Sequence, residues 1–480
     1  MNGTNVLLIT VDDMNYDSMG CMGCAVPDIT PNIDRLAGEG ELCENSYVAI
    51  GVCQPSRSVM LTGRYPHRNG ARGFEEIDFC VTTLTEQLRK HGYLNGIIGK
   101  VDHVEPREKF AWDFIVKTLS PAENWGRDPE KMYEHTREFI QKAKAEQRPF
   151  FLMANSHDPH RPFAGSEFET PQYLVHSGKQ VPYDPAEEQH GEYYRGKYVK
   201  SSRYYEANEV SVPGFLPDLP DVHKEVADYY SSVHRADEAV GRILDALDDE
   251  DMRHNTLVVY LSDNGAALPF SKANCYVNST KSPFIFRLPG VIPQGVRTKA
   301  LISSIDCTPT ILDFLDLPLI EGTDGKSLRS VLTCNTQYQY DTIYTQFFKT
   351  ASNPVTKKAR HFPMRCVQNT RYSYIYNSWA NTGIPFLNES TSGLTFNAMK
   401  EAAKENDEIK QRVDFFLYRT KEEFYDIETD PQCLHNLMEE EEFLPLINSY
   451  RQKLFEYMTA SHDALVDLFK QEILVPNHLS

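Results

Sequence analysis

One short stretch of this sequence holds residue types that could do covalent chemistry: Cys53, followed by Pro55 and Arg57. Pro55 has a fixed φ angle and no N–H group, so it suits the first turn of a helix. Gly63 is a residue type that commonly ends a helix, so we expect a helix between Cys53 and Gly63. Cys53 would then lie at a helix N-terminus, which favours an anion, and Arg57 would add a permanent positive charge. A lone cysteine is more often a small buried apolar residue, so other motifs must support a chemical role.

Two acidic pairs stand at the ends of apolar, β-branched runs. Asp12-Asp13 follows residues 5–11, and Asp263-Asn264 follows residues 257–261 after one serine. Asp and Asn are common in caps and turns, and either pair alone would be assigned that role. Together with the cysteine motif, three carboxylates and an amide oxygen indicate a site for one hard divalent cation. We expect Ca²⁺, with Mg²⁺ as the alternative, rather than Zn²⁺.

Basic residues occupy comparable positions, shortly after an apolar run or after the second acidic pair: Lys100, His103, His157 and Lys272. Each of these side chains alone is more often a surface residue than a catalytic one. Their shared position relative to the apolar runs is what suggests a common site.

The elements that must position these residues follow a pattern of alternating strands and helices. Apolar runs of strand length occur at residues 5–11, 94–98, 149–155 and 257–261, and helical patterns lie between them, including a long amphipathic one at 222–247. This alternation predicts an α/β fold with a large doubly wound, mixed but mostly parallel sheet flanked by helices. Ligands bind at the carboxyl ends of the strands in such sheets, so we expect the polar clusters to converge at one edge.

The pattern changes near residue 360. Residues 364–368 and 371–376 are typical of a hairpin, and residues 439–458 are typical of a helix. We therefore expect a catalytic α/β domain at 1–360 and a smaller C-terminal antiparallel α+β subdomain at 361–480.

A long stretch with little periodicity, residues 164–220, interrupts the expected α/β domain. Loops of this length in a compact fold are usually functional. Its tyrosine-rich part, residues 183–205, is a candidate for stacking against a sugar ring. A solvated loop or a contact between subunits are the alternatives, and an oligomer is left open.

Composition limits the classes of partner. The chain has 480 residues and a formal net charge of −19, whereas a nucleic-acid-binding surface is basic, so no nucleic acid is expected. No apolar run reaches the length of a membrane span.

The ten cysteines leave an odd number once Cys53 is set aside, which does not imply a full disulfide framework. No signal peptide is expected, because the first strand begins near residue 5. A periplasmic or secreted location after signal removal is favoured over a cytoplasmic one.

The stretch from Cys53 to Arg57 reads Cys-Gln-Pro-Ser-Arg, which resembles the signature of type I sulfatases in the alkaline-phosphatase-like superfamily. In that family a formylglycine-generating or equivalent maturation enzyme oxidises the cysteine to formylglycine, whose hydrated aldehyde is the nucleophile. The family binds its divalent cation through acidic pairs of this kind and an oxygen of the formylglycine. The resemblance therefore implies the following metal ligands: Asp12, Asp13, Asp263, Asn264 and modified Cys53.

The resemblance extends over nearly the whole chain. Lys272 and Tyr276 keep the family's register, although the residues between them read Ala-Asn-Cys where the family has a Thr-Leu-Tyr-like segment. A lysine with a following histidine is also usual, but one extra residue separates Lys100 from His103. Further similar segments lie at residues 305–312, 324–328 and 423–437.

The resemblance also implies catalytic roles. The hydrated formylglycine attacks sulfur to form a covalent sulfo-enzyme, while Arg57, Lys100 and Lys272 neutralise the sulfuryl oxygens. His157, together with Lys272, protonates the leaving group. His103 then takes the proton of the second hydroxyl, which expels sulfate and regenerates the aldehyde.

The implied substrate is a sulfated saccharide, and the expected activity is hydrolysis of O-sulfate esters on a glycosaminoglycan or another sulfated glycan. His160 and Arg161 are candidate substrate contacts, with a structural turn as the alternative. Residues 97–100 and 157–161 are most similar to the sulfamidase (N-sulfoglucosamine sulfohydrolase) branch and its bacterial relatives. That branch carries arginine where this chain has Lys272, so the resemblance does not carry N-sulfate specificity over to this chain.

Three alternative functions stay open at this point. The first is a sulfamidase, and the second is a phosphonate or phosphodiester hydrolase of the same superfamily. The third is a non-catalytic binder of sulfated glycans, which applies if Cys53 is not converted.

Overall fold

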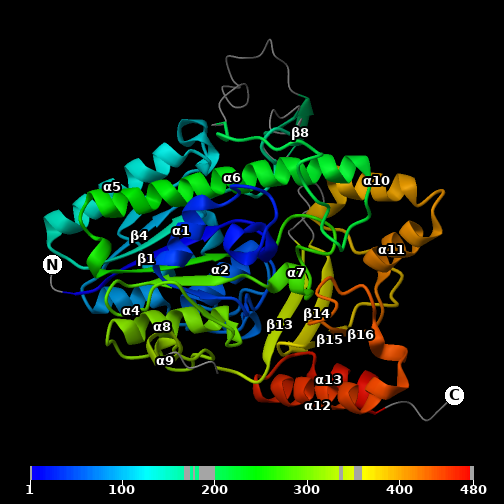
Figure 1. The fold of residues 1–480 in the computed structure, drawn as a ribbon. Coiled ribbons are helices and arrows are strands. Elements are labelled where there is room, and N and C mark those ends of the chain that lie inside the picture. The colour runs from blue at the N-terminus through cyan, green and yellow to red at the C-terminus, as the bar shows by residue number, and fades with distance from the viewer. Residues whose placement is uncertain are drawn as a thin grey trace.

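An eight-stranded sheet runs through the larger part of the molecule (Figure 1). The computed structural model describes residues 3–166, 173–176, 179–182, 200–334, 339–350 and 359–475. The strand order in this sheet is β11-β2-β10-β9-β1-β6-β4-β5. The strands are β1 (Asn5–Val11), β2 (Glu41–Cys43), β4 (Leu94–Ile98), β5 (Phe114–Val116), β6 (Phe150–Asn155), β9 (Thr256–Ser262), β10 (Phe284–Arg287) and β11 (Val296–Thr298).

The four adjacent strands β9, β1, β6 and β4 all run in the same direction. The apolar runs of β1, β6 and β9 are buried along their whole length, as in a parallel sheet that is covered on both faces. β10 pairs antiparallel with both β9 and β2, which makes the sheet mixed. The predicted doubly wound, mostly parallel sheet is therefore confirmed.

Helices cover both faces of this sheet (Figure 1). Leu7 and Ile9 of β1 share a core with α1 (Pro31–Glu39), α5 (Pro129–Glu146) and α6 (Pro220–Asp249). Val6 and Leu8 share the opposite core with α2 (Cys53–Thr62), α4 (Leu84–Lys90), α8 (Cys307–Phe314) and α9 (Arg329–Cys334). This division follows from strand geometry, because successive side chains point to opposite faces of a sheet.

A second, four-stranded sheet is antiparallel and has the order β13-β14-β15-β16. Its strands are β13 (Ile343–Lys349), β14 (His361–Gln368), β15 (Tyr372–Asn377) and β16 (Glu422–Asp426). One face packs against α12 (Leu444–Ala460) and α13 (Val466–Phe469). The other face joins the core of the large part through residues such as Phe347 and Met364. β13 precedes residue 361, so this sheet takes one strand from the range expected for the large domain.

The described chain contains further strands and α-helices. They are β3 (Ser46–Tyr47), β12 (Ile302–Ser303), β7 (Tyr173–His176), β8 (Lys179–Pro182), α3 (Pro66–Asn69), α7 (Val277–Thr280), α10 (Leu394–Ala402) and α11 (Asp407–Tyr418). No helix in the described part of the chain combines the length and the apolar character that a membrane crossing requires. Most of the tyrosine-rich stretch 183–205 lies outside the described residues, so its expected contact with a sugar stays a prediction.

The second sheet supports the loop that follows β9 and carries Lys272. Tyr276, near the end of that loop, donates a hydrogen bond of 2.7 Å to Oε2 of Glu423 in β16. Glu423 is fully buried and also accepts hydrogen bonds from Tyr425 Oη and Asn377 Nδ2, each at 2.6 Å. A buried carboxylate of this kind fixes its donors in place, because leaving it without them is costly.

Replacing Tyr276 by Phe removes one donor from this buried carboxylate. We expect the free energy of unfolding to fall by about 2 kcal/mol, which is typical of a lost hydrogen bond to a charged group. Urea denaturation followed by circular dichroism measures the change. Tyr418→Phe, at an exposed position of α11, is the matched control and is expected to change the value by less than about 0.5 kcal/mol. Equal losses in the two variants would contradict the anchoring role.

Candidate active site

The polar clusters that end the parallel strands meet at one edge of the sheet. Asp12 and Asp13 follow β1, and Asp263 follows β9, so their shared strand direction places them side by side. The Asp13 N–H donates to Asp263 Oδ1 at 3.1 Å, and the Asp12 N–H donates to the Asp158 carbonyl beyond β6 at 3.1 Å. Asp13 has a left-handed φ of 69°, which Asp adopts more readily than most residues. The chain can therefore turn sharply here without a glycine.

Three carboxylates form a compact, buried cluster at this edge. Oxygens of Asp12, Asp13 and Asp263 lie within 4.8 Å of one another, and all three residues are fully shielded from solvent. Among the described residues, both Asp12 oxygens and Asp263 Oδ2 have ion-pair partners in Lys100 and Arg57 but accept no well-aligned hydrogen bond. Buried oxygens without donors are costly, and several of them pointing at one place suit a hard cation.

Asn264 is the fourth expected metal ligand, but its side-chain nitrogen, and not its oxygen, faces Asp13. Its Nδ2 donates to Asp13 Oδ1 at 2.7 Å, while its buried Oδ1 makes no hydrogen bond within the described structure. Amide oxygen and nitrogen exchange places by rotation of the side chain. The residue can therefore present its oxygen to a cation once that rotation has occurred.

Arg57 and Lys100 compensate part of the negative charge. Arg57 Nη2 lies 3.0 Å from Asp263 Oδ2 and 3.7 Å from Asp12 Oδ1, and Lys100 Nζ pairs with Asp12 Oδ2. Burial alone would raise the pKa of Asp12, but Lys100, His160 and Arg57 hold it well below its ordinary value. Burial raises the pKa of Asp263 well above its ordinary value despite Arg57. Ionising Asp263 at this buried position therefore needs further positive charge, which a bound cation would supply.

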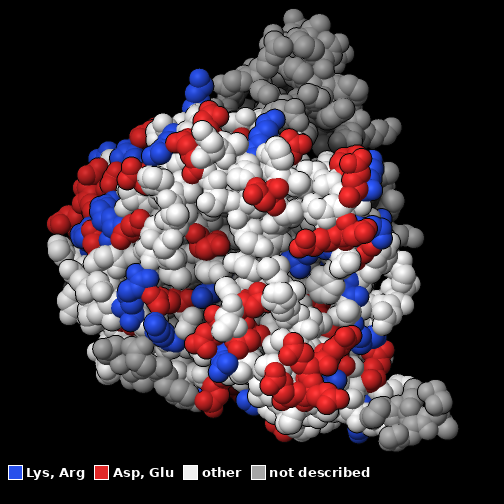
Figure 2. Space-filling view, turned by 45° about the vertical axis from the view of Figure 1, so that its right-hand side comes forward, with Lys and Arg blue, Asp and Glu red and all other residues white. Residues whose placement is uncertain are grey.

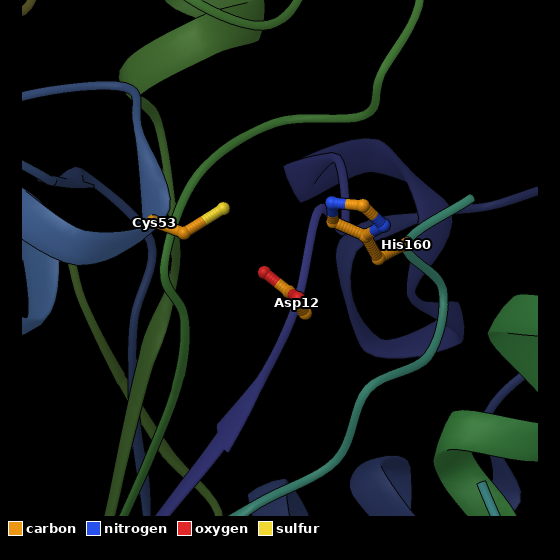
Figure 3. A group of neighbouring side chains, drawn as sticks. All are labelled: Asp12, Cys53 and His160. Atoms are coloured by element: carbon orange, nitrogen blue, oxygen red, sulfur yellow. The ribbon is translucent and has the colours of Figure 1, made fainter. Parts of the chain in front are cut away.

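Cys53 begins α2 and points into the same space. Its Sγ lies 3.8 Å from Asp13 Oδ1, and Sγ, an Asp12 oxygen and a His160 nitrogen lie within 4.8 Å of one another (Figure 3). Gly63 ends the helix with a φ of 64°, as its residue type predicts. Burial, and then the charge of Asp12, raise the pKa of the Cys53 thiol well above its usual range. The helix N-terminus does not outweigh these effects, so the unmodified side chain is a neutral thiol and a weak nucleophile.

His103 and His157 lie on the side of the site that Lys100 occupies. Burial, and then the charge of Lys100, lower the pKa of both imidazoles well below the usual value. Within the described structure, His103 Nδ1 and His157 Nε2 are buried without a hydrogen-bond partner. Neutral imidazoles suit the base role expected for His103. The acid role expected for His157 needs a bound anion, whose charge would raise its pKa.

His160 and Arg161 follow β6 and have different surroundings. His160 Nδ1 donates to the Arg161 carbonyl at 2.7 Å, which leaves Nε2 facing the site, 3.8 Å from Asp13 Oδ2. The Arg161 guanidinium donates to Glu225 Oε1 at 2.6 Å and to the Ala267 carbonyl at 2.9 and 3.2 Å. His160 is thus placed to touch a substrate, whereas Arg161 is held by the protein.

Lys272 reaches the acidic cluster from the loop after β9 and brings a residue that the sequence analysis did not identify. Its Nζ donates to Asp13 Oδ2 at 2.7 Å and to Glu389 Oε2 at 2.8 Å. Asp13 and Glu389 keep the pKa of Lys272 well above its ordinary value despite burial. Lys272 and His160 in turn lower the pKa of Glu389 to about 2 against the effect of burial. Glu389 lies in a polar segment without periodicity, so no sequence pattern links it to Lys272.

The surface outside the site carries many acidic side chains. On the face drawn in Figure 2, acidic side chains are widespread and gather near the C-terminal end of the chain. Arg57, Lys100 and Lys272 place three cationic side chains in one buried site of this acidic protein, each beside a carboxylate. Local charge of this kind can attract an anion despite an opposing net charge.

Comparison with known proteins gives consistent matches. The sequence model of the family described as Sulfatase matches residues 4–317, and the model described as N-sulphoglucosamine sulphohydrolase, C-terminal, matches residues 266–382. The chain is 29% identical to N-sulphoglucosamine sulphohydrolase of Homo sapiens over 96% of this chain and 91% of that protein. It is 25% identical to an ulvan-active sulfatase of Formosa agariphila over 96% of this chain and 75% of that protein.

Solved structures share the fold. One is a protein in complex with its substrate D-glucosamine-2-N,6-O-disulfate, with a TM-score of 0.71 and 18% identity, covering 97% of this chain and 99% of that chain. Another is a 2-O glycosaminoglycan sulfatase, with a TM-score of 0.66 and 18% identity, covering 96% of this chain and 93% of that chain.

Replacing Arg57 by Met tests the charge balance of the acidic cluster. Because the variant leaves Asp263 buried without its main counter-charge and removes a second one from Asp12, we expect the free energy of unfolding in EDTA to fall by about 3 kcal/mol. Added Ca²⁺ should restore part of this loss, since the cation supplies the missing positive charge. Urea denaturation with EDTA or with CaCl₂ measures both values. Arg72→Met, which removes a surface ion pair, is the control; a loss as small as in that control would disprove the compensating role of Arg57.

Proposed function

Because this chain belongs to the sulfatase family, whose sequence model spans residues 4–317, we propose that it hydrolyses sulfate groups on a carbohydrate. The protein is an enzyme of the sulfuric ester hydrolase class. We propose O-sulfate esters of a glycosaminoglycan or another sulfated glycan as its substrates. The observation that carries this proposal is the position of Cys53 Sγ beside the buried cluster of Asp12, Asp13 and Asp263.

We propose that a maturation enzyme oxidises Cys53 to formylglycine. The raised pKa of the thiol supports this step, because an unmodified Cys53 would stay protonated next to Asp12. A hydrated aldehyde at the same position offers two hydroxyl groups, one to attack sulfur and one whose deprotonation releases sulfate. His103 is the proposed base for that release, in agreement with its lowered pKa.

We propose that Asp12, Asp13, Asp263, Asn264 and modified Cys53 hold one divalent cation, Ca²⁺ rather than Mg²⁺. The fit rests on the buried oxygens of Asp12, Asp263 and Asn264 that lack hydrogen bonds in the described structure. When bound, the cation lowers the cost of ionising a hydroxyl and polarises the sulfate oxygens. Ca²⁺ is favoured because it accepts an irregular set of oxygen ligands, whereas Mg²⁺ demands near-ideal octahedral geometry.

The cationic side chains act on the sulfate itself. Arg57, Lys100 and Lys272 are buried and fixed by their carboxylate partners, so they need little rearrangement to neutralise the sulfuryl oxygens. His157 is the proposed acid for the leaving group, with Lys272 as its partner in that role. His160 is a proposed substrate contact through Nε2. Arg161 acts instead as a support, since its donors are taken by Glu225 and Ala267.

A specific observation favours a second candidate, the hydrolysis of N-sulfate groups. It is the similarity to N-sulphoglucosamine sulphohydrolase of Homo sapiens, together with the C-terminal family match. The presence of Lys272 in place of the arginine of the sulfamidase branch is the reason for ranking it second.

A screen of sulfated mono- and oligosaccharides, with O- or N-sulfate at each position, tests the proposed activity through released sulfate. Protein produced with a maturation enzyme should release sulfate, and its intact mass should be about 18 Da lighter than the thiol form. Cys53→Ser should lower the rate by roughly a thousandfold or more, because serine offers no second hydroxyl on the same carbon.

The same screen includes an aryl sulfate and an aryl phosphonate ester. Faster turnover of the phosphonate would favour the phosphonate hydrolase alternative. Full turnover by protein whose mass retains the thiol would contradict the formylglycine mechanism. Protein that keeps the thiol after expression with the maturation enzyme and releases no sulfate would favour a glycan binder.

Calcium binding is tested by the thermal midpoint of unfolding. A cation that binds only the folded state should raise the midpoint of the wild type as its concentration increases. Asp263→Asn should abolish most of this increase, because it removes one of three clustered carboxylates. Asp245→Asn, on the surface of α6, is the control and should respond like the wild type. An equal response of Asp263→Asn and wild type would place the cation elsewhere.

A further inference from the structure

Glu389 is a carboxylate at the candidate active site that the proposed mechanism does not use. It begins a short 3-10 helix, Glu389–Ser392, and lies 117 residues beyond Lys272 in the chain. One of its oxygens, Oε2, is taken by Lys272. The other, Oε1, lies 3.6 Å from His160 Nε2, beyond a normal hydrogen bond. Among the described residues, Oε1 is thus the part of this carboxylate that a ligand can reach.

Glu389 also borders a cavity of about 350 Å³ beside the site. Phe163, Ser166, Asp228, Ser392 and Leu394 contribute to its wall, together with the pair formed by Arg161 and Glu225. The volume falls at the lower end of the sizes that hold small molecules. Because Glu389 belongs both to this cavity and to the Lys272 contact, a ligand in the cavity would lie next to the reacting centre.

The charge that this cavity offers to a ligand is negative. The Arg161 guanidinium, its cationic group, donates to Glu225 and to the Ala267 carbonyl. Glu225 is occupied in turn by Arg161 and by the N–H groups of Leu394 and Thr395. Glu389, whose side chain is 34% exposed, therefore presents an accessible carboxylate at the end nearest Lys272, and Asp228 is a second acidic residue of the wall.

We propose that this cavity holds the sugar that carries the sulfate, and that Glu389 selects sugars with a hydroxyl or ammonium group next to the sulfated position. The inference rests on the proposed sulfatase function and specifies its substrate class. Oε1 would accept a hydrogen bond from that group, and an ammonium would add an attraction between opposite charges. A second sulfate or a carboxylate in the same place would be repelled by Glu389.

The experiment compares a series of amino sugars that carry the amine on the ring carbon next to the sulfated one, such as glucosamine 3-sulfate. The series differs only at the amine, which is free, acetylated or sulfated. We expect kcat/KM of the wild type to be highest for the free amine and lowest for the sulfated one. In Glu389→Gln the ratio between these two extremes should shrink by about tenfold, since one unit of charge is lost.

Two further variants separate selection from a structural role. Glu389→Asp keeps the charge and should keep the order of preference, even if overall activity falls. Ser392→Ala changes a neutral residue of the same cavity and should leave the ratio unchanged. A uniform loss across the series in Glu389→Gln would overturn the proposal, and so would a wild-type preference for the disulfated sugar or for a sulfated uronic acid. A wild type that releases sulfate from none of the sugars would overturn the proposed function itself.

Discussion

Three carboxylates confined within 4.8 Å of one another, without solvent, set the constraint on which the rest of this structure depends. Such a cluster would repel itself and lose hydration, so it persists only where other groups offset both costs. Arg57 and Lys100 offset part of the charge of Asp12, and Lys272 does the same for Asp13. The oxygens that still lack hydrogen bonds are those that a hard cation would use. The cationic side chains and the proposed metal ligands are therefore parts of one electrostatic arrangement.

The parallel sheet makes this arrangement achievable. β1, β6, β4 and β9 run in the same direction, so residues far apart in sequence meet at their carboxyl ends. The strands are buried on both faces and fix the backbone, while the loops beyond them turn the side chains inward. The second sheet contributes from outside this core. Through the Tyr276 contact with Glu423 it holds the loop of Lys272, and the segment after β15 delivers Glu389. The small C-terminal part is thus a component of the site and not an independent appendage.

The surroundings of Cys53 support the proposal that a modified residue, rather than a thiol, is the nucleophile. A helix N-terminus favours a thiolate, but burial and the nearby charge of Asp12 act more strongly in the opposite direction. A hydroxyl nucleophile that is ionised only when a cation is present avoids this conflict. The neutral state of His103 and His157 has the same origin, because burial and Lys100 disfavour imidazolium until an anion binds. The negative charge of a bound sulfate would therefore favour protonation of these two histidines, which the positive charge of Lys100 opposes.

The sequence by itself determined the large sheet, because buried strands such as residues 5–11 are continuous apolar runs whose polar ends must lie at an edge. It also located Cys53, the acidic pairs and the basic residues, since Cys53 begins a predicted helix and the others follow the ends of predicted strands or the second acidic pair. Tertiary structure alone decided the partners. The pairing of Lys272 with Glu389, the use of Arg161 to hold Glu225, and the inclusion of β13 in the second sheet depend on contacts between distant segments. No local pattern encodes such contacts, because a single charged residue in a loop has the same sequence context whether it faces water or a buried lysine.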